Sequence, residues 1–225
     1  MKKRVFITGA SRGIGEATLY EFAKAGWDVR FSYYQDKHEA VQVGKKCSEL
    51  GASSVRFFKL DVMKDADIKR IAKSVGEVDV LINNAGYLKY GSFRRHSFRE
   101  IELECRTNFE GLVKLTHVML PLVREQIVNV ASRAGKIAHA GLVSYCGTKF
   151  GVRGFTIALA DEVKRLKCFC VNPGLTATHM TRFEGVPVDK VGRVIFEAVV
   201  GERRVGSGGD VDVWKIVRGK KTREG

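Results

Sequence analysis

Two side chains near the middle of the sequence could transfer a proton. They lie in the hexapeptide SYCGTK, residues 144–149, where Tyr145 and Lys149 stand four residues apart. In a helix this spacing places both side chains on one face. A free phenol has a pKa of about 10, and a neighbouring ammonium favours the phenolate and lowers that pKa. The pair predicts a proton donor for an oxygen that gains negative charge, but the same spacing also arises by chance, so the surrounding elements must support it.

A glycine-rich segment near the N-terminus, TGASRGIG at residues 8–15, closes an apolar run and opens an amphipathic one. In such a setting a pyrophosphate rests on free backbone N–H groups at the positive end of a helix. Gly9, Gly13 and Gly15 let the backbone turn tightly and approach the phosphates without a Cβ in the way. The segment predicts a dinucleotide-binding loop, with a ligand-free glycine-rich turn as the alternative.

Apolar runs and amphipathic stretches alternate along the chain. The apolar runs predict strands over residues 4–8, 27–33, 54–60, 78–83, 127–130 and 168–172, with an edge strand over 211–217. Helical spacing predicts helices over 14–25, 38–50, 65–75 (with Asp65 as its cap), 98–124, 143–166 and 189–200. Strands alternating with helices through tight connections form parallel sheets covered on both faces. We expect one α/β domain over residues 1–225, a doubly wound parallel sheet, with a basic tail from about residue 215.

Composition sets limits on the function. The 225 residues are 44% hydrophobic, and the apolar runs are far shorter than the roughly 18 residues of a membrane span. The five cysteines at positions 47, 105, 146, 168 and 170 lack C-x-x-C spacing and histidines at zinc spacing, so we expect no metal site. Cys168 and Cys170 alternate within one apolar run and predict two buried residues on one strand face. Such a scattered, odd set suits a reducing compartment, and we expect a cytoplasmic protein without a membrane partner.

The formal net charge is +14, and part of it lies at the two ends of the chain. Elsewhere basic and acidic residues are interleaved, as in residues 64–70, and no aromatic-studded basic stripe accompanies them. We therefore expect no nucleic-acid partner. Attraction for an anionic cofactor or substrate is the interpretation that the charge favours.

Four motifs occur in a fixed order. They are the G-x-x-x-G-x-G loop ending at Gly15, the N-N-A-G of residues 83–86, Ser132 thirteen residues before the Tyr145–Lys149 pair, and Pro173-Gly174. Together they resemble the short-chain dehydrogenase/reductase family, in its ordinary, non-extended branch, over about residues 4–200. The resemblance implies a Rossmann fold and an oxidoreductase, such as a carbonyl reductase, that transfers hydride between a nicotinamide and a carbonyl or alcohol substrate.

The resemblance also implies a role for each member of a catalytic set. Tyr145 is the general acid/base, and Lys149 also holds the hydroxyls of the nicotinamide ribose. Ser132 hydrogen-bonds the substrate carbonyl. Asn108 kinks the long helix over 98–124 and holds a water in the proton relay from Lys149.

The choice of cofactor depends on the end of the second strand. An acid there binds the ribose 2′-OH of NAD and repels the 2′-phosphate of NADP. This strand ends in SYYQ, residues 32–35, without an acid before Asp36, and Arg12 in the glycine loop matches the arginine of family members that use NADP. We therefore expect NADP(H), with NAD(H) as second choice. The expected cofactor-binding residues are Gly9, Ser11, Arg12, Gly13, Ile14, Gly15, Ser32, Tyr33, Asp61, Val62, Asn84, Ala85, Gly86, Tyr145, Lys149, Pro173, Gly174, Thr176 and Thr178.

The chain is short where the family binds substrate. Little sequence separates Met180 from the helix at Asp189, so we expect a small lid and an open pocket for broad or bulky substrates. Residues 87–93, 133–142 and 178–186 should line that pocket, but they identify no particular small molecule. The family's usual C-terminal strand is also replaced, and the helices over 98–124 and 143–166 could still pair in a homodimer or homotetramer.

Two other functions use the same fold. Epimerases and dehydratases share the Ser-Tyr-Lys set, but they usually carry G-x-x-G-x-x-G spacing and a larger C-terminal region. A nucleotide-sensing regulatory protein would normally have lost Tyr145 or Lys149, and both are present.

Overall fold

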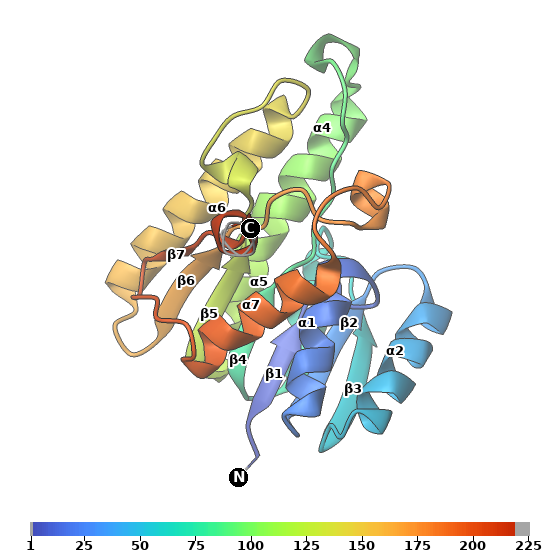
Figure 1. The fold of residues 1–225 in the computed structure, drawn as a ribbon, viewed down its shortest axis with the longest axis vertical. Coiled ribbons are helices and arrows are strands. Elements are labelled where there is room, and N and C mark those ends of the chain that lie inside the picture. Colours follow the sequence, from blue (N-terminus) through green and yellow to red (C-terminus); the bar gives the residue numbers. More distant parts are fainter. Residues whose placement is uncertain (1, 219–225) are drawn as a thin grey trace, which may run out of the picture.

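The computed structural model describes residues 2–218, in which seven strands form one sheet in the order β3-β2-β1-β4-β5-β6-β7 (Figure 1). All neighbouring strands pair in parallel. The strands are β1 (Arg4–Ile7), β2 (Asp28–Tyr33), β3 (Ser54–Lys59), β4 (Val78–Asn83), β5 (Val123–Val130), β6 (Lys167–Val171) and β7 (Asp210–Val211). The predicted doubly wound parallel sheet is confirmed.

Helices cover both faces of this sheet. They are α1 (Gly13–Lys24), α2 (Lys37–Glu49), α3 (Asp65–Val75), α4 (Phe98–Cys105), α5 (Gly111–Met119), α6 (Val143–Glu162), α7 (Val188–Val200) and α8 (Val213–Arg218). One apolar core joins the sheet to α1, α2, α7 and α8, and a second core joins it to α3, α5 and α6. Successive residues of a strand serve opposite cores: Val5 and Ile7 lie in the first and Phe6 in the second.

The chain reverses its direction of winding between β1 and β4, which are neighbours in the sheet although two strands separate them in sequence. In open α/β sheets, ligands bind outside the carboxyl ends of the strands at such a switch point. The glycine loop after β1 and the N-N-A-G segment after β4 meet there.

The helix predicted over 98–124 forms as α4 and α5, with a π-helical turn (Arg106–Glu110) between them at Asn108, where the sequence predicts a kink. Its predicted end is wrong, because a 3₁₀ turn (Leu120–Leu122) ends the helical segment before residue 124. Pro121 lies in that last turn, and β5 begins directly after it, four residues earlier than predicted. Val123 and Arg124 therefore belong to a strand, because pairing with β4 outweighs the helical spacing.

Two smaller predictions also change. The helix predicted over 143–166 ends at Glu162, because Val163 leaves the helical conformation and Leu166 is buried at the entry to β6. Asp65 is the first residue of α3 rather than its cap, and its carboxylate binds Lys114 at 2.8 Å instead.

The C-terminal edge strand predicted over 211–217 is mostly helical. The strand β7 has two residues, and α8 follows it. In α8, Val213 is buried and Ile216 and Val217 pack against the same core, which is a helical rather than an alternating spacing. Residues 215–218 of the predicted basic tail belong to α8, and residues 219–225 lie outside the described part of the chain.

The five cysteines are free thiols, and Cys168 and Cys170 are buried on β6 as predicted. Within residues 2–218, no helix combines the length and the apolar character needed to cross a bilayer.

Candidate active site

The glycine loop joins the end of β1 to the start of α1. Gly9 and Gly13 have φ angles of 61° and 63°, a region that favours glycine. Arg12 precedes α1 in an extended conformation and its side chain does not cap the helix. Because a guanidinium cannot accept a hydrogen bond, Arg12 leaves the first N–H groups of α1 without a side-chain cap, as an anion-binding helix end requires.

The segment after β4 holds this loop in place. The Asn84 side chain donates to the carbonyls of Thr8 and Gly9 at 2.9 and 3.0 Å. The Thr8 hydroxyl accepts the N–H groups of Asn84 and Ala85 at 2.9 and 3.0 Å. A Cβ at Gly15 would stand 2.5 Å from the Asn84 amide nitrogen, so only glycine fits. The loop and its support fit the dinucleotide cradle predicted from sequence.

Tyr145 and Lys149 lie one turn apart on α6. The Lys149 side chain is almost fully buried, and its Nζ donates to the Val130 carbonyl at 2.8 Å. The same Nζ lies 5.7 Å from the centroid of the Tyr145 ring. Tyr145 itself is partly buried, and the structure places the predicted pair on one face of α6.

Asn108 lies in the π-helical turn between α4 and α5 and is fully buried. Its Oδ1 accepts the Tyr87 N–H at 2.7 Å, and its Nδ2 donates to the Tyr87 carbonyl at 2.8 Å. Nδ2 also lies 3.3 Å from the hydroxyl of Thr148, next to Lys149. A Cβ at Gly86 would meet Asn108 Oδ1 at 3.3 Å and Lys149 Nζ at 3.9 Å, which places these three residues together.

Ser132 lies two residues after the end of β5 and has an extended backbone. Its hydroxyl accepts the Ala134 N–H at 3.1 Å. Hydrogen bonding by Ser132 also acts on Tyr145, where it opposes the effect of burial on the phenol. Ser132, Asn108, Tyr145 and Lys149 thus come together from three elements that are separate in sequence.

The predicted lowering of the Tyr145 pKa by Lys149 is wrong for the chain as it stands. Burial raises the pKa of Tyr145 to about 12, and the charge of Glu104 acts in the same direction. Burial lowers the pKa of Lys149 to about 8. The physical reason is that the ammonium lies over the ring and bonds to the Val130 carbonyl, while desolvation disfavours both charged forms.

The adenosine end of the expected cofactor site lies where β2 ends. The Ser32 hydroxyl accepts the Gly9 N–H at 3.1 Å and so supports the loop. Tyr33 is buried and packs against Phe57, with ring centroids 6.2 Å apart. Arg12 is half-exposed and pairs at 3.0 Å with Glu39 in the first turn of α2.

Asp61 and Val62 follow β3 and are buried. The Asp61 carboxylate accepts the Met63 N–H at 3.0 Å. A Cβ at Gly111 would stand 2.5 Å from the Val62 carbonyl, so this segment packs directly on α5.

The segment after β6 reaches back to the glycine loop. A Cβ at Gly13 would meet the Thr178 methyl at 3.4 Å, which places Thr178 beside the loop. Thr176 is buried, and its hydroxyl donates to the Gly174 carbonyl at 3.0 Å. The Pro173 carbonyl accepts the Arg133 N–H at 2.7 Å, next to Ser132. Ser11 is buried within the loop, and Ile14 packs against the first core.

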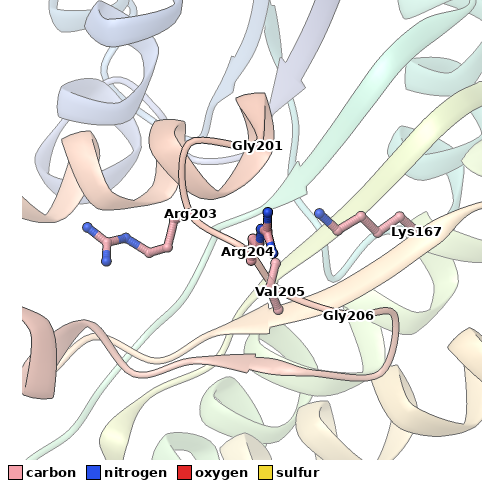
Figure 2. Close-up of a pocket in the computed structure, with 6 residues that line it drawn as sticks. All are labelled: Lys167, Gly201, Arg203, Arg204, Val205 and Gly206. Carbon is pink, nitrogen blue, oxygen red and sulfur yellow. The ribbon is translucent and has the colours of Figure 1, made fainter.

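A hollow of about 430 Å³ lies elsewhere, where β6 begins and α7 ends (Figure 2). It is lined by Lys167, Gly201, Arg203, Arg204, Val205 and Gly206. None of the predicted site residues contributes to it. Because it opens at the amino end of a strand, we assign the chemistry to the carboxyl edge of the sheet instead.

A sequence profile of the family described as short chain dehydrogenase matches residues 3–186. This chain belongs to the short chain dehydrogenase family. The matched residues include the glycine loop, the N-N-A-G segment, Ser132, the Tyr145–Lys149 pair and Thr178.

Relatives in this family carry several names. The chain is 32% identical over 205 residues to the 3-oxoacyl-[acyl-carrier-protein] reductase FabG of Aggregatibacter actinomycetemcomitans. The alignment covers 87% of this chain and 84% of the relative. It is 34% identical over 188 residues to estradiol 17-beta-dehydrogenase 11 of Homo sapiens, which covers 75% of this chain. The chain spans only 60% of the length of that relative.

Solved structures share the fold. A short chain dehydrogenase from Burkholderia cenocepacia J2315 in complex with NADP is 24% identical, with a TM-score of 0.85 over 93% of this chain and 95% of that one. The oxidoreductase yciK from E. coli is 23% identical, with a TM-score of 0.87 over 94% of each chain.

Sequence reasoning missed several polar residues of the site. Thr8 holds the segment after β4, and Glu39 engages Arg12. Glu104, fully buried on α4, binds the hydroxyl of Ser144 at the start of α6. Glu39 and Glu104 read as ordinary helix-surface acids in the sequence, because only the packing of α2 and α4 brings them to the site.

Proposed function

We propose that the chain is an NADP(H)-dependent oxidoreductase that transfers hydride between a nicotinamide and a carbonyl or alcohol substrate, with Tyr145 as general acid/base. The observation that carries this proposal is the convergence of Ser132, Asn108, Tyr145 and Lys149 beside the glycine loop. The family match gives the reaction class, and this geometry supports the individual roles.

The chain's own residues fit a dinucleotide. The uncapped N–H groups at the start of α1 would receive the pyrophosphate. Thr178, beside Gly13, and the backbone near Thr176 would hold the nicotinamide end. When bound, the nicotinamide supplies or accepts the hydride, and the protein contributes binding, orientation and proton transfer.

Reduction of a carbonyl builds negative charge on its oxygen. The Ser132 hydroxyl donates a hydrogen bond to that oxygen, and the Tyr145 phenol delivers the proton. Lys149, with a pKa of about 8, can hold or release a proton near neutral pH and replenish the phenol. Asn108 keeps the Tyr87 backbone fixed beside this path.

NADP is the favoured cofactor because the end of β2 carries no acid before Asp36, and Asp36 is engaged in capping α2. Arg12 is half-exposed at the loop and can turn from Glu39 towards a 2′-phosphate. The Burkholderia cenocepacia dehydrogenase, which shares the fold, was solved in complex with NADP, and this is consistent with the choice. NAD is the second choice.

The substrate we propose is a bulky or apolar carbonyl or alcohol compound. The segment after Thr178 exposes Met180 and Phe183, and Leu175 before it is also exposed. An apolar rim suits an apolar ligand that loses water contacts on binding. Relatives named for oxidation of estradiol and for reduction of 3-oxoacyl groups support a CH–OH or carbonyl substrate.

We also infer a cytoplasmic location, which the five free cysteines support. Epimerisation or dehydration with the same residues is the alternative enzymatic function, and nucleotide sensing is the alternative without catalysis. Neither has an observation in the described residues that favours it over hydride transfer.

One assay tests the proposal. NADPH and, separately, NADH absorbance is followed with ketones, aldehydes and diketones of increasing apolar size. We expect turnover with NADPH, a loss of about 10²–10⁴-fold in Tyr145→Phe because the proton donor is removed, and unchanged NADPH binding by fluorescence.

The matched control is Tyr20→Phe, because the Tyr20 hydroxyl on α1 bonds with Glu16 and with no other described residue, and its loss should leave turnover intact. Full activity in Tyr145→Phe would exclude the proposed acid. NADPH binding without turnover of any carbonyl would favour the sensor.

A further inference from the structure

Glu104 is a fully buried acid one helical turn before Asn108. Its Oε1 accepts the Lys89 N–H at 2.8 Å, and its Oε2 accepts the hydroxyl of Ser144. Within the described residues it forms no ion pair, and the Lys89 ammonium is engaged with Glu100 at 2.9 Å. A buried carboxylate held only by neutral donors is costly, so its position calls for an explanation.

Glu104 and Asn108 form two matching links between the same three segments. Each bonds the backbone of residues 87–89: Asn108 binds Tyr87, and Glu104 binds Lys89. Each also reaches α6, which packs beside α4 (Figure 1). There Glu104 holds Ser144 and Asn108 holds Thr148.

The two contacted residues of α6 stand four apart, and each immediately precedes a member of the catalytic pair. Ser144 precedes Tyr145, and Thr148 precedes Lys149. Ser144 lies in the first turn of α6, where the preceding Leu142 provides no side-chain cap. The Glu104 contact therefore fixes the helix end that carries the phenol.

We propose that Glu104 is a positioning residue that fixes Tyr145 at the start of α6 and keeps its phenol protonated through a nearby negative charge. The inference rests on the proposed function and assigns Glu104 to the control of that site. It distinguishes Glu104 from a purely structural link, which would hold α6 without affecting protonation.

The groups that face Tyr145 come from several elements. They are Glu104 from α4, Cys146 and Lys149 from α6, and the Ser132 hydroxyl after β5. Burial is the main cause of the raised pKa of Tyr145, and the Glu104 charge adds to it. Replacing Glu104 by a neutral side chain of the same size should therefore lower the pKa of Tyr145.

The test compares Glu104→Gln with Ser144→Ala in alcohol oxidation, where phenolate is the active base and the rate rises with pH. Glutamine keeps the size and can still accept the Lys89 N–H. We expect the rising limb of kcat/KM in Glu104→Gln to move to lower pH by about half to one unit, a gain of about three- to tenfold below the midpoint. Ser144→Ala keeps the charge and should lower kcat without this acid shift.

A second readout needs neither substrate nor cofactor. Phenolate absorbance at about 295 nm is titrated in each protein and in its Tyr145→Phe counterpart, and the difference isolates Tyr145. We expect the pH midpoint of this Tyr145 titration to be lower in Glu104→Gln than in the parent protein. An unchanged midpoint in folded Glu104→Gln, checked by circular dichroism, would overturn the inference. Absence of turnover in the parent protein would instead count against the proposed function.

Discussion

Lys149 carries a charge in a place that disfavours it. Its ammonium is buried, donates to the Val130 carbonyl and lies over the Tyr145 ring. Burial lowers the pKa of Lys149 to about 8, close to the pH at which a proton relay must exchange. The negative charge of Glu104 on α4 acts on Tyr145 and favours its neutral phenol. The site thus combines one group biased towards losing its proton with another biased towards keeping it.

Glu39 pairs with Arg12, the residue that we propose binds the 2′-phosphate of NADP. The two side chains pair at 3.0 Å and are both partly exposed. Exposed pairs contribute about 0.2–1 kcal/mol, so Glu39→Gln should free Arg12 and raise NADPH affinity up to about fivefold. Fluorescence titration with NADPH and NADH measures the change, and Arg12→Ala should shift it in the opposite direction. A selective loss of NADH affinity in Glu39→Gln would instead identify Glu39 as a ribose-binding acid.

The glycine loop and α6 use glycine for different reasons. A Cβ at Gly15 would collide with Asn84 and the Gly9 carbonyl, whereas a Cβ at Gly154 in α6 would meet nothing within 4 Å. The first glycine is required by packing, and the second only adds conformational freedom to the unfolded chain.

We therefore expect opposite effects from one substitution at the two positions. Gly154→Ala should raise the free energy of unfolding by about 0.5–1 kcal/mol and leave cofactor binding unchanged. Gly15→Ala should lower the thermal midpoint and weaken NADPH binding at least about tenfold, because the loop must move. Thermal unfolding with and without NADPH compares both proteins. Wild-type binding in Gly15→Ala would contradict the assigned loop.

The short strand β7 is tied to α6 by charges. Arg153 on α6 holds both oxygens of Asp210 at 3.0 and 2.6 Å and also the Gly135 carbonyl at 3.0 Å. Lys136 bridges Asp210 and Asp212 at 3.1 and 2.8 Å. This network joins the segment of β7 to the turn after Ser132.

The ion pairs of Asp210 should make the stability of the folded protein depend on pH. Burial raises the pKa of Asp210, but hydrogen bonds from Arg153, Asn172 and Lys136 outweigh it and lower the value to about 2. An unfolded aspartate has a pKa of about 3.9. The ionised Asp210 carboxylate therefore contributes fully to the free energy of unfolding well above pH 4, and this contribution is lost as the pH falls through 2.

Asp210→Asn should lower the free energy of unfolding by about 2–3 kcal/mol at pH 7, and about half of that difference should be left at pH 3. Urea unfolding at both pH values measures it. Asp161→Asn is the control, because Asp161 is exposed on α6, the helix that carries Arg153, and within the described residues it pairs only with Lys164. A difference independent of pH would show that Asp210 acts through packing alone.

At the scale of the molecule, an apolar patch crosses the outer side of α6 and the π-helical turn. Phe150 and Ile157 lie seven residues apart on α6, and both are exposed. The Phe109 ring lies within 3.2 Å of a Cβ position at Gly151, beside Phe150. Isolated exposed apolar residues are ordinary, but neighbouring ones on one surface favour association.

We expect the purified chain to form a dimer or tetramer through this patch, as proposed from the two long predicted helices. Ile157→Glu should shift the mass measured by light scattering towards the monomer, because an unpaired carboxylate would be buried in the contact. Lys46→Glu on α2 alters charge on the opposite side of the sheet and should leave the mass unchanged. A monomeric parent protein would exclude this interface.

The sequence by itself determined the sheet and the order of its main elements, and it predicted the place of the chemistry. Buried parallel strands need apolar runs, and a glycine loop needs glycines at fixed positions, so both leave local signals. The predicted catalytic set, Ser132, Asn108, Tyr145 and Lys149, was identified from motifs of this kind. The structure brings these four side chains together, while their catalytic roles stay predictions.

Only the tertiary structure decided what each side chain contacts. The early start of β5 and the formation of α8 in place of a strand follow from packing between distant segments. The burial of Glu104, the pairing of Arg12 with Glu39 and the raised pKa of Tyr145 have the same origin. Local sequence specifies backbone preference and apolar pattern, whereas desolvation and the distance between charges depend on neighbours from elsewhere in the chain.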